Sequence, residues 1–228
     1  MNQAKSKILL AVLTGVERQN WINPDLTLTI IKMVRDPRFE VAFFPVTDIR
    51  PWECARNKTI QAARQIGAEW LISFDNDNFV EGNGNPLDII ASAGPEQHVI
   101  GLTYGVSKGD RSFELFPCAS GATDGAFRET ESVAGGVLMV RNTVWQNIPR
   151  GPWFRWQHAD NELLELDAST CGEDVYFCRL VRQHGMRVWT HEQMAGHYRS
   201  VDLTGMVCSL DQIRPKPVQP SQWVTQPR

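Results

Sequence analysis

The feature that most constrains this fold is the alternation, early in the chain, of strand-length apolar runs with segments of helical spacing. The apolar runs are KILLAVLT at 7–14, FEVAFFPV at 39–46 and EWLISF at 69–74. The segments between them, 24–36 and 52–66, have helical character, and the second ends at Gly67, a natural helix stop. Continuous apolar runs are typical of strands buried on both faces. The pattern therefore predicts an α/β fold, with a mostly parallel sheet and helices on both faces.

The second half of the chain is less regular. We expect strands at 98–104, at 132–140 (SVAGGVLMV, interrupted by two glycines) and at 186–191, and helices at 142–147 and 172–185. The glycine-, serine- and charge-rich stretch 105–130 is predicted to be a long mobile loop. One domain would span 1–200, with a nucleotide-binding half at about 1–104 and an acceptor half at about 105–200. Residues 201–228 would form a tail.

Composition excludes few functions. A chain of 228 residues with 42% hydrophobic and 21% charged residues is an ordinary globular protein. A net charge of -3 disfavours a uniformly basic nucleic-acid surface. The five cysteines form no C-x-x-C pair, so we interpret them as reduced thiols in a cytoplasmic protein. No apolar run reaches membrane-spanning length, and we expect no membrane span.

The sharpest chemical signal is Asp75-Asn76-Asp77, directly after an apolar strand. Two carboxylates at a strand end can turn toward one hard cation whose other positions take diphosphate oxygens. Ligands of parallel sheets bind beyond such strand ends, where Thr14 and Gly15 are also expected. An acidic turn is the alternative for the Asp pair.

Three further features lie downstream. Glu173-Asp174 opens a helix, where the macrodipole favours charged carboxylates whether or not they act in catalysis. Gly135-Gly136 in an apolar strand suggests close approach of the backbone to a ligand, with a bulge as the competing account. His197 could offer a neutral imidazole to the same cation, and His191 could play the same part.

The order of these elements resembles the GT-A glycosyltransferases: a strand with D-x-D, a strand with a glycine pair, a G-E-D helix start and a C-terminal His. The resemblance covers about residues 7–198. It implies that Asp75 and Asp77 are the D-x-D pair, with Asp77 the more direct ligand of Mn²⁺ or Mg²⁺, and that His197 is the metal-binding His. Asp174 would be the general base of an inverting enzyme, with Glu173 as its catalytic neighbour.

The resemblance also implies the substrate contacts. Gly135 and Gly136 would form a loop near the donor sugar, and the run Ala55-Arg56-Asn57 would place Arg56 near the nucleotide. Donor binding is thus assigned to a set from four segments: Thr14, Gly15, Arg56, Asn57, Asp75, Asn76, Gly135 and Gly136. The donor would be a UDP- or GDP-sugar, and the activity a hexosyl- or pentosyltransferase.

The acceptor side has an aromatic cluster, Trp153, Phe154 and Trp156, interleaved with Arg150 and Arg155. Aromatic faces stack on sugars or bases, and arginines hold phosphate. Trp153, Arg155 and Trp156 are therefore candidate acceptor-binding residues, and a hydrophobic hinge closing the core is the alternative. The acceptor could be a glycan, a small molecule or, given basic residues in the tail, modified DNA.

Two other functions stay open. A sugar nucleotidyltransferase uses a similar sheet and metal carboxylates, but the loop TGVERQNWINP after the first strand holds only one Gly and one Arg. A non-catalytic module that binds nucleotide sugars is the other, and intact Asp75, Asp77 and Asp174 count against it. The sequence leaves the donor sugar, the acceptor and the oligomeric state undetermined.

Overall fold

The computed structural model describes residues 5–14, 22–108, 112–116, 121–156 and 172–197. All of these belong to one compact unit, Met1–Tyr198. The tail and the segments containing Gly15 and three of the five cysteines lie outside the described residues, while Cys54 and Cys178 are free thiols. Within the described part, no helix combines the length and apolarity that crossing a membrane requires.

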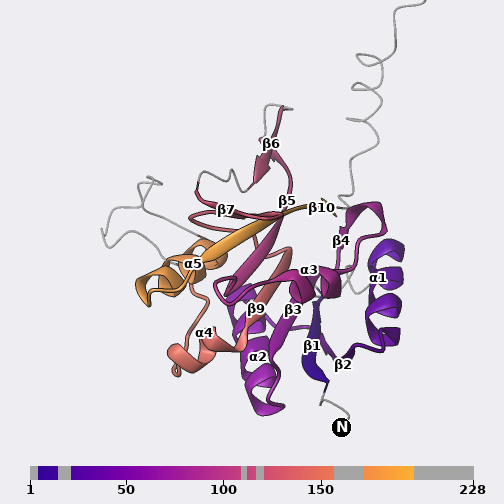
Figure 1. The fold of residues 1–228 in the computed structure, drawn as a ribbon, viewed down its shortest axis with the longest axis horizontal. Coiled ribbons are helices and arrows are strands. Elements are labelled where there is room, and N and C mark those ends of the chain that lie inside the picture. Colours follow the sequence, from indigo (N-terminus) through magenta and orange to yellow (C-terminus); the bar gives the residue numbers. More distant parts are fainter. Residues whose placement is uncertain (1–4, 15–21, 109–111, 117–120, 157–171, 198–228) are drawn as a thin grey trace, which may run out of the picture. The chain divides into compact units, whose positions relative to one another are not determined.

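The fold is built on one large mixed sheet (Figure 1). Its main path has the order β2-β1-β3-β9-β5-β10-β8-β7, with β4 paired to β10 and β6 paired to β5. The strands are β1 Ser6–Leu13, β2 Phe39–Val46, β3 Trp70–Asp75, β4 Asn78–Val80, β5 Val99–Lys108, β6 Ser112–Phe116, β7 Thr123–Asp124, β8 Phe127–Glu129, β9 Val137–Arg141 and β10 Val188–His197.

Strand directions make the centre of the sheet mostly parallel. β1 is parallel to β2 and β3, and β5 is parallel to β10. β9 runs antiparallel to both β3 and β5, so these two point the same way. Five of the six central strands therefore end at one edge of the sheet, and β9 begins there.

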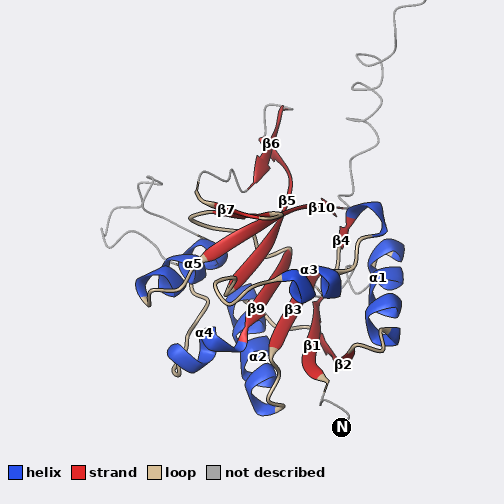
Figure 2. Ribbon diagram, viewed as in Figure 1, coloured by secondary structure: helices blue, strands red, loops and turns tan. Residues whose placement is uncertain are grey.

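Helices cover both faces of the sheet (Figure 2). They are α1 Pro24–Arg35, α2 Trp52–Gln65, α3 Pro86–Ser92, α4 Asn142–Asn147 and α5 Glu173–Gln183, with a short 3₁₀ turn, η2, at Glu81–Asn83. One core joins alternate residues of the sheet to α2, α4 and α5, and a second core joins the remaining ones to α1 and α3. The predicted α/β fold, a mostly parallel sheet with helices on both faces, is confirmed.

The start of α1 is fastened to the segment after β3 through Asn23. Its Oδ1 accepts a hydrogen bond from the Leu26 amide at 2.7 Å, which caps the helix. Its Nδ2 donates to the backbone carbonyls of Asn76 and Asn78, at 3.2 and 3.3 Å. Asn23 is fully buried. One asparagine thus holds the turn that carries the D-x-D motif.

Three expectations for the second half were wrong. The stretch 105–130 is not one long loop, since it holds the end of β5 and strands β6, β7 and β8. Phe127 in β8 is 4% exposed and joins the core, which supports this edge. The strand at 132–140 begins only at Val137, after the glycines, because they form a turn. β10 extends to His197 because it pairs with β4 beyond a bulge at His191/Met194.

Candidate active site

The candidate site lies at the edge where the central parallel strands end. Asp75 is the last residue of β3, and a turn at Asn76 and Asp77 leads into β4. β4 pairs with the end of β10, which places His197 opposite Asn78. Through this pairing, His197 Nε2 lies 3.1 Å from Asp77 Oδ2, although the residues are 120 positions apart.

Arg56 joins the two acidic pairs. Its Nη2 donates to both carboxylate oxygens of Asp75, at 3.1 and 3.0 Å, and its Nε donates to Glu173 Oε1 at 3.2 Å. Its Nη1 donates to the Gly135 carbonyl at 3.0 Å. The side chain is only 6% exposed. Burial opposes its charge, but the carboxylates of Asp75, Glu173 and Asp174 outweigh burial and raise the pKa of Arg56, which stays a cation.

The glycine pair is required by side chains of the protein itself. A Cβ on Gly135 would come within 2.5 Å of the Arg56 guanidinium, and one on Gly136 would overlap Asn78 Oδ1. The Gly136 carbonyl accepts from the Asp75 amide at 2.9 Å. The Gly135 amide donates to Asp174 Oδ2 at 3.2 Å. The two glycines therefore connect β3, α2 and α5 at one point.

Asp174 is a partly buried carboxylate with two backbone donors. Its Oδ1 accepts from the Val175 amide at 2.8 Å, and its Oδ2 faces Gly135. Burial, followed by the charge of Glu173, raises the pKa of Asp174, and Arg56 only partly opposes this. The sequence expectation that the helix start favours the charged form is thus outweighed by desolvation. A raised pKa suits a group that must accept a proton near neutral pH.

The predicted three-residue metal set is not assembled as one cluster. Asp77 meets His197, whereas Asp75 faces Arg56, because the turn after β3 separates the two carboxylates. Across the described ranges, no group of three or more His, Cys, Asp and Glu side chains is arranged to hold a metal ion. The Nδ1 of His197 is buried and has no hydrogen-bond partner among those residues.

Sequence reasoning missed Tyr104 and Asn78. The Tyr104 ring meets the His197 ring edge-on, with centroids 5.5 Å apart. Burial, and then the charges of Asp75 and Asp174, raise the pKa of Tyr104 to about 12, so its hydroxyl remains a donor. Asn78 is buried, and its Nδ2 contacts Asp77 Oδ1 at 3.4 Å. A polar-tipped aromatic at the end of the strand expected at 98–104 was the available signal for Tyr104.

Three further residues were predicted to bind the donor: Thr14, Gly15 and Asn76. Thr14 is buried at the end of β1, and its Oγ1 has no hydrogen-bond partner in the described part of the chain. Asn76 is held by its backbone to Leu13 and Asn23. Gly15 lies outside the described residues.

Asn57, predicted to bind the donor, makes four hydrogen bonds within the protein. Its Nδ2 donates to the carbonyls of Glu53 and Phe154, and its Oδ1 accepts from the amides of Trp153 and Phe154, all within 2.7 to 3.1 Å. These bonds use both amide hydrogens and both lone pairs. Asn57 therefore fixes the segment after α4 and has no hydrogen-bonding capacity left for a donor substrate.

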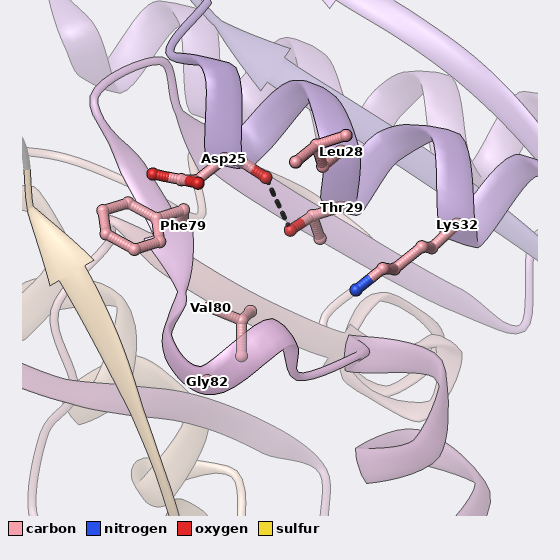
Figure 3. Close-up of a pocket in the computed structure, with 7 residues that line it drawn as sticks. All are labelled: Asp25, Leu28, Thr29, Lys32, Phe79, Val80 and Gly82. Atoms are coloured by element: carbon pink, nitrogen blue, oxygen red, sulfur yellow. Dashed lines mark hydrogen bonds between the residues drawn. The ribbon is translucent and has the colours of Figure 1, made fainter.

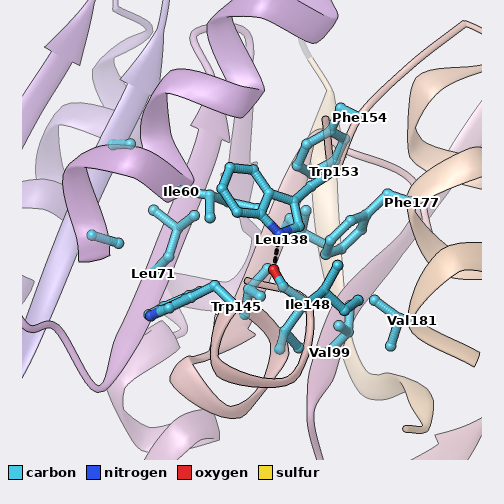
Figure 4. Packing of buried hydrophobic residues seen from close by; sticks show 14 of the residues in the cluster. Ile60, Leu71, Val99, Leu138, Trp145, Ile148, Trp153, Phe154, Phe177 and Val181 are labelled. Carbon is cyan, nitrogen blue, oxygen red and sulfur yellow. Dashed lines mark hydrogen bonds between the residues drawn. The ribbon is translucent and has the colours of Figure 1, made fainter. Parts of the chain in front are cut away.

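The aromatic cluster also separates into two parts. Trp153 is 2% exposed, and its Nε1 donates to the Ile148 carbonyl at 2.9 Å (Figure 4). Phe154 stacks on Phe177 with ring centroids 4.3 Å apart. Trp153 was predicted to bind the acceptor; its ring lies in the core, as the alternative of a hydrophobic hinge had it. Arg155 and Trp156 are exposed.

Trp156 lies beside the helix that carries Asp174. An added Cβ at Gly172 would lie 3.0 Å from Asp174 Oδ1 and 3.9 Å from Trp156 Cη2. Trp156 is 43% exposed, so a large apolar side chain is accessible to solvent close to Gly172, the residue that precedes the acidic pair. Trp156 thus lies near the site, whereas Trp153 belongs to the core.

A surface pocket of about 190 Å³ lies between α1 and β4 (Figure 3). Its lining includes Asp25, Leu28, Lys32 and Phe79. Its lining includes none of the charged residues of the candidate site, which are Arg56, Asp75, Asp77, Glu173, Asp174 and His197. The charged groups, and not this pocket, therefore mark the candidate active site.

No family model matches the chain, and no curated protein matches it. Solved structures resemble it in fold. Protein A197 from STIV superposes with a TM-score of 0.53 at 15% identity, covering 86% of each chain. This likeness supports the fold alone.

Two further structures superpose with TM-scores below 0.5. GalNAc-T7 with UDP, GalNAc and Mn²⁺ has a TM-score of 0.49 at 12% identity, covering 87% of this chain and 45% of that one. UDP-glucose pyrophosphorylase complexed with UDP-glucose has a TM-score of 0.45 at 9% identity, covering 90% and 80%. Likenesses this distant carry no argument about activity.

Proposed function

We propose that this chain is a glycosyltransferase that moves a sugar from a nucleoside-diphosphate sugar to an acceptor hydroxyl, with inversion at the anomeric carbon and with a divalent cation. The observation that carries the proposal is the meeting of two acidic pairs from distant parts of the chain. Arg56 contacts Asp75 and Glu173 at once, and Asp77 contacts His197. A helix cap or an acidic turn alone would not require this convergence.

The residues present suit a cation shared with a diphosphate. Asp77 supplies a hard oxygen and His197 an imidazole, a combination compatible with Mn²⁺ and less typical of Mg²⁺. The Nε2 atom of His197 lies 3.1 Å from Asp77 Oδ2, so a nitrogen and an oxygen suited to one cation already face each other. Asp77 and His197 would hold the cation, and diphosphate oxygens and water would complete its coordination. When bound, the cation would neutralise charge on the departing diphosphate.

Asp174 is our proposed general base. In the transfer, the acceptor oxygen bonds to the anomeric carbon as the bond from that carbon to the diphosphate breaks. The nucleoside diphosphate leaves with the electron pair, and the acceptor proton passes to Asp174. Its two backbone hydrogen bonds hold the carboxylate in place, and its raised pKa brings it nearer to working pH.

Neighbouring groups orient this chemistry. Glu173 is held by Arg56 and is assigned an orienting role. Trp156 presents an exposed ring beside Asp174, where an acceptor sugar or another flat apolar group could stack. Tyr104 keeps its proton and is a hydrogen-bond donor in the site.

Cys178 fits the role of a nucleophile less well. Burial raises the pKa of Cys178 to about 12, so its reactive thiolate is scarce at neutral pH.

The test is donor hydrolysis and binding. The protein is incubated with Mn²⁺ and UDP-glucose, UDP-galactose, UDP-GalNAc or GDP-mannose, and released nucleoside diphosphate is measured. The control contains EDTA. We expect release from at least one donor and Mn²⁺-dependent binding of the matching diphosphate by calorimetry. Absence of both with every donor would refute the proposal. Formation of pyrophosphate from a nucleoside triphosphate and a sugar 1-phosphate would instead identify a nucleotidyltransferase.

A further inference from the structure

The hydrogen bonds of Arg56 differ from those expected of a residue that binds a nucleotide directly. All three nitrogens of its guanidinium contact protein acceptors: Nη2 contacts Asp75, Nε contacts Glu173 and Nη1 contacts the Gly135 carbonyl. The side chain is buried and its charge is opposed by carboxylates on two sides. Little of its hydrogen-bonding surface is left for a substrate.

The contacts connect two halves of the proposed chemistry. Asp75 belongs to the segment that carries Asp77, and Glu173 precedes Asp174 in α5. Gly135 forms a second connection, because its carbonyl accepts from Arg56 while its amide donates to Asp174. A shift of the guanidinium would therefore move the Gly135 peptide and, through it, Asp174.

The same contacts change the role of Asp75. Both of its oxygens accept from Arg56 Nη2, whereas Asp77 contacts His197. Asp75 is thus engaged by a permanent internal cation, and both of its oxygens already accept hydrogen bonds, which leaves it less available to a divalent ion near Asp77. Only the planar fork of arginine reaches three acceptors in three directions, and a lysine ammonium does not reproduce it.

We propose that Arg56 is a positioning residue that couples the cation site to the base, and that Asp75 anchors Arg56 and is not itself a metal ligand. This inference rests on the proposed function, because it assigns roles within that reaction. Arg56 acts through Asp75, Glu173 and Gly135, and needs no contact with the substrate. Losing its fork would misplace Asp174 while leaving Asp77 and His197 able to take a cation.

The experiment is a double-mutant cycle of Arg56→Lys and Asp75→Asn, with Asp77→Asn for comparison. The matched control is Lys58→Met, which removes one positive charge from the exposed side of the same helix. Arg56→Met is avoided because it leaves buried carboxylates without a partner. Circular dichroism verifies the fold, calorimetry measures Mn²⁺-dependent UDP binding, and donor hydrolysis gives kcat and KM.

We expect Arg56→Lys and Asp75→Asn each to lower kcat by about 100-fold, the scale of a misplaced reacting group, with UDP affinity changed by less than about fivefold. The double variant should lose little more than either single one, because both changes remove one interaction. Asp77→Asn should lose Mn²⁺-dependent binding, and Lys58→Met should match the unsubstituted protein.

The possible failures are distinguishable. If the unsubstituted protein binds no nucleotide with Mn²⁺, the proposed function fails and this inference fails with it. If that protein is active but Arg56→Lys keeps its kcat, or Asp75→Asn loses Mn²⁺-dependent binding as Asp77→Asn does, the inference alone is overturned. Fully additive losses in the double variant would also overturn it.

Discussion

Replacing Asp174 by asparagine separates a catalytic role from a helix-capping role. Asparagine has nearly the same shape, and its carbonyl oxygen can still accept from the Val175 amide. In the native protein, Asp174 Oδ2 accepts a hydrogen bond from the Gly135 amide at 3.2 Å. In the variant, the NH₂ group of asparagine would take the place of Oδ2, so two donors would face each other. The substitution therefore loses one hydrogen bond and the ability to take a proton.

The two consequences differ greatly in size. Losing the bond to Gly135 costs about 1 kcal/mol of stability. A second effect has the opposite sign. Burial and the charge of Glu173 raise the pKa of Asp174 in the folded state, so the folded protein binds a proton at this carboxylate more tightly than the unfolded chain does. The group's contribution to stability then falls as pH rises from the unfolded pKa, about 3.9, through the folded pKa.

Above the folded pKa, the charged carboxylate destabilises the fold, and asparagine removes that penalty. We expect the free energy of unfolding at pH 7 to change by about 1 kcal/mol or less in either direction. The value of kcat should fall by about 10²-fold to 10⁴-fold, the scale of losing a general base. Stability and turnover would thus respond independently.

The assay combines urea unfolding with steady-state kinetics on the donor and acceptor that the unsubstituted protein uses. Calorimetry with UDP and Mn²⁺ serves as the control that the donor site is intact. A variant that keeps more than about a third of the normal kcat would refute the assignment of the base, since a general base contributes far more. A product with retained anomeric configuration would reject the inverting mechanism even if the variant were inactive.

Three further sets of substitutions test the metal site, the glycine pair and the two tryptophans. Asp77→Ala should abolish Mn²⁺-dependent UDP binding in calorimetry without changing the far-UV spectrum, and equal affinity would contradict the metal assignment. Gly136→Ala should lower the free energy of unfolding by about 1–3 kcal/mol because its Cβ overlaps Asn78, whereas Gly105→Ala, where nothing lies within 4 Å, should change it little. Trp153→Ala should cost about 3–5 kcal/mol in urea unfolding, whereas Trp156→Ala should leave stability almost unchanged and lower acceptor affinity. Equal stability losses for the two tryptophans would argue against their separation into core and surface.

The first half of the fold was predictable because its signals are local. Buried parallel strands give continuous apolar runs, and β2 begins and ends where FEVAFFPV does. α1 begins at the proline that follows its capping Asn23, a signal contained in adjacent residues. The strands β6, β7 and β8 were missed because each is short and gains its stability from pairing with β5, with β10 or with one another.

In the site, residue types were predictable but their partners were not. A carboxylate pair after a strand and another at a helix start are visible in the sequence. That Arg56 contacts both pairs depends on Glu173, 117 positions further along the chain, folding back onto it, which no local pattern encodes. The glycine pair was noticed for its low strand propensity, but its cause, the side chains of Arg56 and Asn78, is a tertiary contact.

The sequence by itself therefore determined the α/β alternation, the strand ends at which polar groups gather, and the carboxylates available for chemistry, because periodicity and capping act over a few residues. Only the tertiary structure decided which of those groups meet. It paired Asp77 with His197, turned Asp75 toward Arg56, raised the pKa of Asp174 and buried Trp153 while leaving Trp156 exposed. Desolvation and charge pairing depend on neighbours brought in from distant segments, so these properties arise only once the chain has folded.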